Sequence, residues 1–257
     1  MAIIENNIRE LNKLETLQQR SLWMNFLHPL GKLLVCVLYI LFITSIDKYD
    51  ITSLIMMSVY LAFSFIIGEI CLREGLYRMR LILPLVMFVG ILNPFFDREI
   101  LFTVGNIHIS GGVVSMVTLI LKGLYSVLSA YILIATTSID DICYSLRMLH
   151  VPKIIVIVIM LIYRYFIVMA QEADRIMTAY KLRAPSQNGI HYKAWGTLVG
   201  QWLLRSMDKA ENVYESMLLR GFNGDFFVAK KKIGFIDIIY PVIWVIIFAI
   251  IRWRILF

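Results

Sequence analysis

The chain has 257 residues, of which 60% are apolar, and its mean hydropathy is +0.76. A soluble domain carries about 45–50% apolar residues, and here the excess lies in long runs, so the composition predicts several membrane-spanning segments and excludes a soluble globular domain. The formal net charge of +7 fits the basic cytoplasmic loops of a multi-pass protein and does not require nucleic acid as a partner.

Residues that commonly carry chemistry are few and scattered. The three cysteines and four histidines are widely separated, and no pair has the spacing of a metal site. No Gly-x-x-x-x-Gly-Lys-Ser/Thr motif is present, so we expect this chain not to hydrolyse ATP. We therefore expect no catalytic residue, no metal ligand and no cofactor-binding residue in it.

The N-terminal leader, residues 1–29, is polar and lies before the first apolar run. Ile4, Ile8 and Leu11 recur in it at helical spacing. It either lies along the membrane surface or is a frayed cytoplasmic tail. No small-residue cleavage site follows the first apolar run, so we expect no secretory signal peptide.

Residues 30–137 contain four apolar runs that we predict to cross the membrane. The runs are 30–46, 51–70, 81–96 and 112–137. A span needs about 20 residues, so the first run is marginal, and the third is short and interrupted by Pro84 and Asn93-Pro94. Lys122 lies inside the fourth run, where a charge is either functional or structural, by snorkelling to the membrane surface or by pairing within the helix bundle.

The basic residues give these spans an orientation. They are concentrated in the leader, after the second run and after the fourth, whereas the alternate loops carry only Lys48 and Arg98. The positive-inside rule therefore predicts a cytoplasmic N-terminus in a multi-pass protein of the plasma or inner membrane. Four crossings return the chain to the cytoplasm near Thr137.

The region 138–233 is predicted to form mainly cytoplasmic coupling helices. Its segment 171–233 holds ten basic and six acidic residues, although the apolar run 152–170 precedes it. We resolve this conflict by predicting one non-spanning helix that continues from this run to Arg183, about 48 Å long at about 1.5 Å per residue. Its first half is expected to be buried against other helices, and Arg164 agrees because a charge at mid-bilayer costs at least about 2.5 kcal/mol.

Residues 234–257 supply the final membrane-spanning helix. The predicted fold class is thus an all-α integral membrane protein, with about five membrane-spanning helices plus long cytoplasmic coupling helices.

Two arginines stand in matched settings, Leu182-Arg183-Ala184 and Leu219-Arg220-Gly221. Each closes an amphipathic helical stretch, and Pro185 or Gly221 then stops the helix. The predicted apolar faces consist of Ala173, Ile176, Met177 and Tyr180 in the first stretch, and Ala210, Val213, Met217 and Leu218 in the second. One arginine in a last turn can serve the helix dipole alone, but the repeated arrangement favours contact with a two-fold partner.

The stretch Ser216-Met-Leu-Leu-Arg-Gly-Phe-Asn-Gly-Asp-Phe226 resembles the second arginine signature of the transmembrane (T) component of energy-coupling factor (ECF) transporters, cobalt-type branch. His28-Pro-Leu-Gly-Lys-Leu33 resembles that family's Asp-Pro-Arg-x-Lys-Leu string at the first span, with His28 in place of Asp and Gly31 in place of Arg. Weaker likenesses are Asn93-Pro94, Thr136-Thr-Ser138, Leu149-x-Val-Pro152, Tyr163-Arg-Tyr165 and Gln171-Glu172. The first arginine signature, Leu182-Arg183-Ala184-Pro185, departs from the family's Ala-Arg-Gly.

The resemblance implies a non-catalytic subunit that couples ATPase motion to a separate substrate-binding membrane subunit. It implies as partners two cytoplasmic ATP-binding subunits, which bind ATP-Mg, together with that membrane subunit and the lipid bilayer. The residues implied to dock onto the ATPases are Leu182, Arg183, Ala184, Leu219, Arg220 and Gly221. The Arg-Gly-Phe-x-Gly string suggests cobalt ion as substrate, while nickel or a vitamin stays open because the capturing subunit sets it.

Two other classes of function compete with this one. A self-sufficient channel or secondary transporter needs intramembrane polar residues converging on a path, or inverted repeats; the chain has few of the former and no visible repeat. An integral membrane enzyme needs paired His, Glu, Asp or Ser on adjacent spans, and none occurs at usable spacing.

Overall fold

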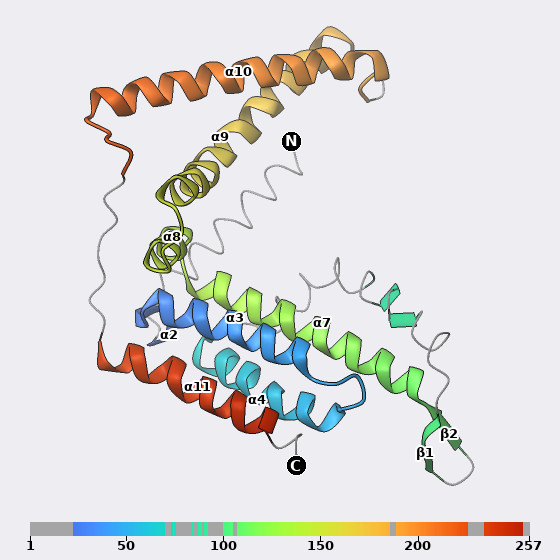
Figure 1. Cartoon of the computed structure of the whole chain (residues 1–257). Helices are drawn as coiled ribbons and strands as arrows, with labels where there is room; N and C mark the ends of the chain where they lie inside the picture. Colours follow the sequence, from blue (N-terminus) through green and yellow to red (C-terminus); the bar gives the residue numbers. More distant parts are fainter. Residues whose placement is uncertain are drawn as a thin grey trace. The chain divides into compact units, whose positions relative to one another are not determined.

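The computed structural model describes residues 23–69, 100–104, 107–185, 189–225 and 234–253, with isolated positions between 73 and 91 (Figure 1). The leader up to residue 22, most of the third apolar run, the Asn93-Pro94 motif and the end of the second arginine signature at Phe226 lie outside the described residues. The chain divides into two compact units, one built from Glu15–Ile142 with Lys230–Phe257 and one from Met1–Leu14 with Cys143–Ala229.

The first unit is a bundle of apolar helices. Its elements are α2 (Trp23–Phe26), α3 (Pro29–Ser45), α4 (Ile51–Ile67), α7 (Gly111–Thr136) and α11 (Phe235–Trp253). Helix α3 packs against α7 and α11, and α4 packs against the same two helices. By length and composition α7 and α11 are suited to crossing a membrane, whereas α3 and α4 are shorter apolar helices of 17 residues each, about 26 Å long.

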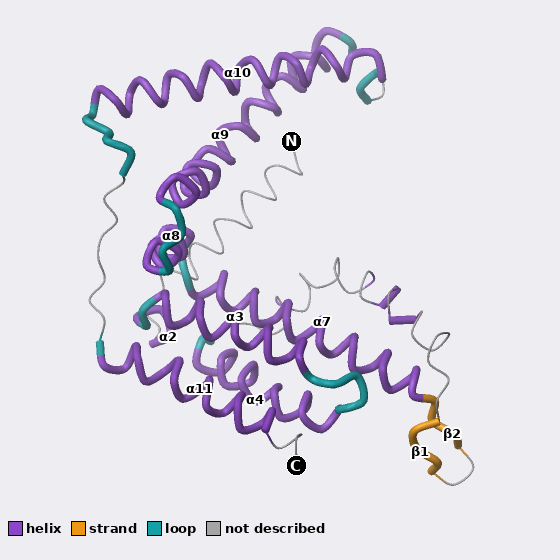
Figure 2. The backbone as a smooth tube through the Cα atoms, viewed as in Figure 1, coloured by secondary structure: helices purple, strands orange, loops and turns teal. Residues whose placement is uncertain are grey.

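The predicted all-α membrane class is confirmed, with one small addition. A two-stranded antiparallel hairpin, β1 (Ile100–Val104) and β2 (Ile107–Ser110), leads directly into α7 (Figure 2). Its register pairs Ile100 with Ser110 and Val104 with Ile107, with an irregularity near Phe102. Isoleucine, valine and threonine favour strands, but a hairpin this short gives little signal within an apolar sequence.

An aromatic cluster fills the centre of the bundle. Tyr39 of α3 lies with its ring centroid 4.5 Å from that of Tyr60 of α4 and 5.3 Å from that of Phe248 of α11. Trp244 meets Tyr60 edge to face at 4.9 Å. Tilted and edge-to-face contacts at these distances are favourable beyond the burial of area, so the cluster holds α3, α4 and α11 together.

Two lysines cap helix ends reciprocally across the α3–α7 pair. Lys32 in the first turn of α3 donates to the carbonyl of Thr136, the last residue of α7, at 2.8 Å. Lys122 of α7 donates to the carbonyl of Ile46, which ends α3. Because the last carbonyls of a helix lack partners within it and carry partial negative charge, each lysine stabilises the other helix. Lys122 therefore pairs within the bundle, one of the alternatives that the sequence left open.

A single carboxylate joins the starts of α3 and α11. Asp237 accepts from the backbone N–H of His28 through Oδ1 and from that of Gly234 through Oδ2, both at 2.7 Å. His28 caps α3 itself, because its Nδ1 accepts from the N–H of Leu30. A Cβ at Gly31 would lie 3.2 Å from the carbonyl of Asp237, so glycine at this position permits the close approach of the two helices.

The second unit contains α9 (Lys153–Arg183) and α10 (Tyr192–Leu219); α8 (Ile139–Met148) leads into it. Ser138 immediately precedes α8, and its hydroxyl accepts from the N–H of Asp141 in the first turn. The 31 residues of α9 form one helix, which confirms the predicted continuity from the apolar run to Arg183.

Within its own unit the first half of α9 is largely exposed, and its expected burial against other helices stays a prediction. Among its described residues only Val156 and Ile176 are buried, while Ile154, Ile162 and Phe166 are 75%, 61% and 60% exposed. Apolar side chains surround this half of the helix on most sides, and α10, the long helix of the same unit, leaves most of them uncovered. By length and composition α9 is itself suited to crossing a membrane, and its non-spanning placement stays a prediction.

Replacing Lys32 by methionine tests the reciprocal capping. Lys32 is only 5% exposed, so Lys32→Met leaves a buried carbonyl at the end of α7 without its donor and should lower the free energy of unfolding by about 1–3 kcal/mol. Thermal unfolding in detergent measures this, with Lys193→Met at an exposed position of α10 as the control. Equal stability of the two variants would contradict the capping role.

Candidate functional site

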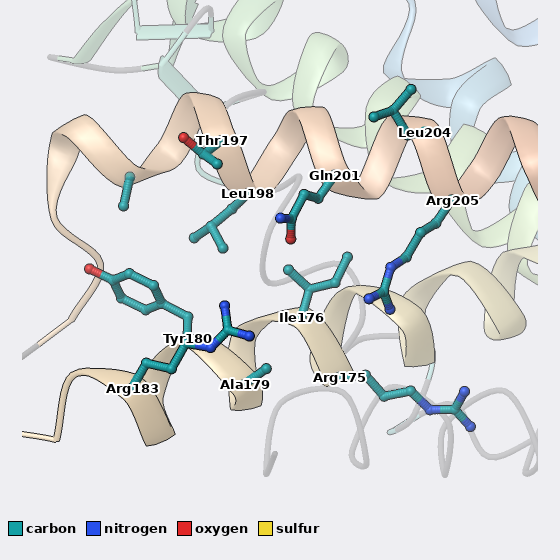
Figure 3. Close-up of a pocket in the computed structure, with 11 residues that line it drawn as sticks. Arg175, Ile176, Ala179, Tyr180, Arg183, Thr197, Leu198, Gln201, Leu204 and Arg205 are labelled. Carbon is teal, nitrogen blue, oxygen red and sulfur yellow. The ribbon is translucent and has the colours of Figure 1, made fainter.

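Helices α9 and α10 run in opposite directions and enclose a groove at each end of their contact. The first groove, of about 620 Å³, lies between the C-terminal part of α9 and the N-terminal part of α10 (Figure 3). Arg175, Arg183 and Arg205 line it, together with apolar side chains that include Ile176 and Leu198. No carboxylate is among these lining residues, although Glu172 outside the groove pairs with Arg175 and Arg205.

Arg183 lies at the outer end of this first groove because α9 ends with it. Ala184 follows as the C-cap, with its N–H donating to the carbonyl of Tyr180 at 3.1 Å. The backbone N–H of His191 donates to the Tyr180 hydroxyl at 3.2 Å, which ties the start of α10 back to α9. Leu182, next to the arginine, is 78% exposed.

The second groove has the same volume, about 620 Å³, and contains the second arginine. Its cationic lining residues are Arg164, Lys209 and Arg220, with Asp225 as an acidic neighbour; its apolar lining residues are Leu161, Val213, Met217 and Phe222. Leu219, immediately before the arginine, is 89% exposed. The two signature arginines thus lie at opposite ends of one helix pair, each with an exposed leucine beside it.

A Schellman motif sets the position of Arg220. The N–H of Phe222 donates to the carbonyl of Met217 at 3.0 Å, and that of Gly221 donates to the carbonyl of Leu218 at 2.9 Å. Gly221 has a φ of +78°, the left-handed conformation predicted for it, which glycine adopts at little cost.

The predicted apolar faces contribute unequally to this arrangement. Ile176 is buried and lines the first groove with Tyr180, and Val213 and Met217 line the second. Ala173 and Met177 are half-buried, whereas Ala210 and Leu218 are exposed. Only part of the apolar face predicted for α10 therefore contacts α9, namely Val213 and Met217.

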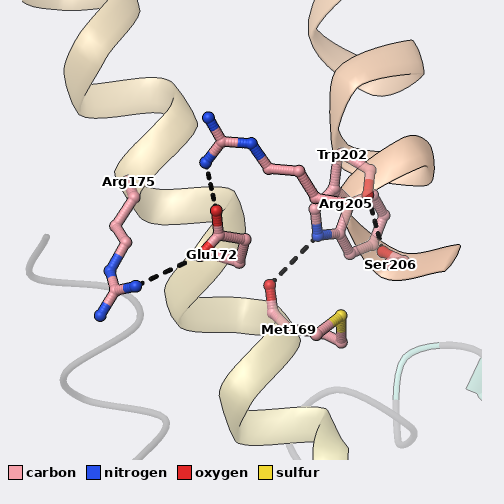
Figure 4. A network of polar contacts seen from close by, with 6 residues as sticks. All are labelled: Met169, Glu172, Arg175, Trp202, Arg205 and Ser206. Carbon is pink, nitrogen blue, oxygen red and sulfur yellow. Dashed lines mark hydrogen bonds and ion pairs between the residues drawn. The ribbon is translucent and has the colours of Figure 1, made fainter. Parts of the chain in front are cut away.

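The two helices are joined between the grooves by a polar cluster that the sequence alone did not reveal (Figure 4). Glu172 of α9 accepts from Arg205 of α10 and, at 3.3 Å, from Arg175. The indole N–H of Trp202 donates to the carbonyl of Met169 at 3.2 Å. In the sequence, only the likeness of Gln171-Glu172 to a family feature pointed to this cluster. The bonded residues are 33 positions apart, so they form no local sequence pattern.

Asp225 is a second residue that the sequence did not single out as functional. Its Oδ2 accepts from Arg147 at 2.7 Å and from Lys153 at 3.2 Å. The hydrogen bond from Lys153 and then that from Arg147 hold the pKa of the Asp225 carboxyl below its usual 3.8, although desolvation acts in the opposite direction. This carboxylate therefore joins the end of the second arginine signature to the corner between α8 and α9.

The chain resembles known proteins over most of its length. Residues 20–233 match the model of the CbiQ family, described as cobalt transport protein. The uncharacterized protein MJ1571 of Methanocaldococcus jannaschii is 23% identical over 216 residues, which cover 80% of this chain and 74% of that protein. The nickel permease LarQ of Lactiplantibacillus plantarum is 30% identical over 91 residues, covering 35% of this chain and 33% of LarQ.

Alanine at two glycines of the helix pair should have opposite effects. Gly221→Ala places a Cβ on a residue with φ of +78°, so it should lower the free energy of unfolding by about 1 kcal/mol. Gly196→Ala, in open space on α10, should raise it by about 0.5–1 kcal/mol. Thermal unfolding of both variants measures these two changes in stability. A higher unfolding temperature for Gly221→Ala than for wild type would contradict the left-handed cap.

Acid should abolish the contribution of Asp225 to stability. The pKa of the Asp225 carboxyl is lower in the folded than in the unfolded protein, where it is about 3.9. Its ionised form therefore stabilises the fold fully above the unfolded pKa, and this stabilisation is lost as the pH falls through the folded pKa. The difference in unfolding temperature between wild type and Asp225→Asn should therefore be constant above about pH 5 and vanish on acidification. A difference that increases at low pH would show that the ion pairs are not its source.

Proposed function

The chain belongs to the CbiQ family of cobalt transport proteins, and we propose that it is the coupling subunit of an ATP-driven importer of the ECF type. The family makes it a membrane transport component rather than an enzyme. In the proposed complex, two cytoplasmic ATP-binding subunits bind ATP-Mg, and a separate membrane subunit captures the substrate.

The repeated arginine-ended groove is the observation that carries this proposal. Each groove is lined by one helix-terminal arginine and by apolar side chains. An exposed leucine, Leu182 or Leu219, precedes that arginine in the chain. Within the described part of the chain, neither Arg183 nor Arg220 forms an ion pair. Arginine beside apolar surface is typical of binding hot spots, and its planar fork binds carboxylates or backbone carbonyls. Two similar sites on one chain suit two copies, or two homologues, of a partner subunit.

The proposed mechanism is mechanical. Closure of the ATPase pair on ATP moves its two docking surfaces toward each other, and the ends of α9 and α10 follow because each is anchored by an arginine. The contact between Glu172 and Arg205 keeps the two helices joined near the middle. Movement of the ends therefore passes along α9 into its apolar half and from there to the membrane subunits.

We propose cobalt ion as the substrate, because the family is described as cobalt transport protein. Nickel is the second candidate, because one relative is named a nickel permease. Uptake of radioactive cobalt and nickel by cells that express the complete transporter separates the two. Dependence of uptake on ATP separates this function from a channel or a secondary transporter.

Charge reversal at either signature arginine should abolish coupling. Arg183→Glu or Arg220→Glu in the complete transporter should lower metal uptake by at least about tenfold, since a hot-spot arginine contributes about 2 kcal/mol or more to binding. Lys181→Glu is the matched control, because Lys181 is an exposed cation in the same last turn as Arg183 and does not line the first groove. Normal uptake by both arginine variants would refute the coupling assignment.

A further inference from the structure

We infer that Asp225 is a positioning residue for Arg220: its carboxylate fastens the end of α10 to the corner between α8 and α9. It thereby fixes where the second signature arginine is presented. The positioning itself concerns the geometry of this chain, whereas its consequence for transport rests on the proposed function.

The chain between the two residues is short and turns back on itself. Gly221 and Gly224 both have positive φ, +78° and +76°, so the backbone curls immediately after α10 ends. Arg220 and Asp225 consequently line the same groove. Most of this loop is exposed, and the ion pairs of Asp225 connect it to Arg147 and Lys153.

The carboxylate binds two cations that come from two different helices. Arg147 lies in the last turn of α8, and Lys153 is the first residue of α9. They are 78 and 72 residues before Asp225 in the chain. An isolated surface ion pair stabilises little, but one carboxylate shared by two converging cations fixes a position in space.

The corner that carries the two cations is itself tightly determined. Two residues after α8 ends, His150 has a φ of +62°, a left-handed conformation that is unfavourable for a residue with a Cβ. Two backbone bonds enforce it, from Val151 to the carbonyl of Leu146 and from His150 to that of Arg147, both at 3.2 Å. Pro152 then serves as the N-cap of α9. Arg147 and Lys153 are therefore held in a fixed relation, and Asp225 docks onto a preformed pair of cations.

The placement of Asp225 also affects the charge of the second groove. As an acidic lining residue of that groove, Asp225 is a potential ion-pair partner for Arg220. The structure instead places its carboxylate on Arg147 and Lys153. Arg220 keeps its guanidinium available for a partner subunit in this arrangement.

Distances between spin labels test the positioning directly. In the full chain, with Cys71→Ser and the buried Cys36 and Cys143 kept, labels at Leu149→Cys and Leu219→Cys report the α10 end against the corner. Both leucines are exposed. Asp225→Asn should broaden this distance distribution, and Asp225→Glu should preserve it. Unchanged distances in Asp225→Asn would overturn the inference, whatever the transport result.

Two controls separate a local effect from general unfolding. A label pair at Ile154→Cys and Leu182→Cys lies within α9, and its distance should not change in Asp225→Asn. Asp208→Asn, which removes an exposed carboxylate from α10, should leave both label pairs as in wild type. Broadening of the Ile154–Leu182 distance as well would indicate loss of the fold and overturn a specific positioning role.

The functional consequence is measured separately in the complete transporter. Asp225→Asn should lower metal uptake to a level between wild type and Arg220→Glu, and Asp225→Glu should restore it. Broadened distances with normal uptake would support the positioning and count against the role proposed for Arg220. Narrow distances with reduced uptake would overturn the positioning while leaving the proposed function intact.

Discussion

The contact between Glu172 and Arg205 is the constraint on which the candidate site depends. It joins α9 and α10 near the middle, with the indole of Trp202 bonded to the carbonyl of Met169 close by (Figure 4). Because this polar cluster lies between the two arginine-ended grooves, it leaves both ends of the pair open. The same two helices can then present two similar surfaces, as a pair of related partner subunits requires.

Cations at helix C-termini serve two different purposes in this protein. In the membrane bundle, Lys32 and Lys122 bind the last carbonyls of neighbouring helices, so their charges are used within the fold. In the helix pair, Arg183 and Arg220 also stand at helix ends, but they line open grooves beside exposed leucines. The helix dipole favours a cation in either setting. Exposure and apolar surroundings distinguish the structural caps from the two arginines for which docking is proposed.

The sequence predicted those features that local patterns encode. The continuous α9, the left-handed cap at Gly221 and the position of both arginines follow from periodicity and from helix-stopping residues. The burial predicted for the first half of α9 is not provided by its own unit, because hydropathy reports that a surface avoids water but not what covers it. The ion pairs of Glu172 and Asp225 join distant positions, so no local pattern contains them. The family's string at the first span has Asp and Arg where this chain has His28 and Gly31. The structure gives local reasons, because the backbone of His28 bonds to Asp237 and Gly31 lets α11 approach closely.

Site-specific cross-linking tests the central claim most directly. A photoreactive group attached at Leu182→Cys or at Leu219→Cys, in the assembled transporter, should link this chain to an ATP-binding subunit from either position. With both positions labelled, one chain should capture two ATP-binding subunits, because each groove holds its own. Linkage only to lipid or to the substrate-binding subunit from both positions would contradict the account.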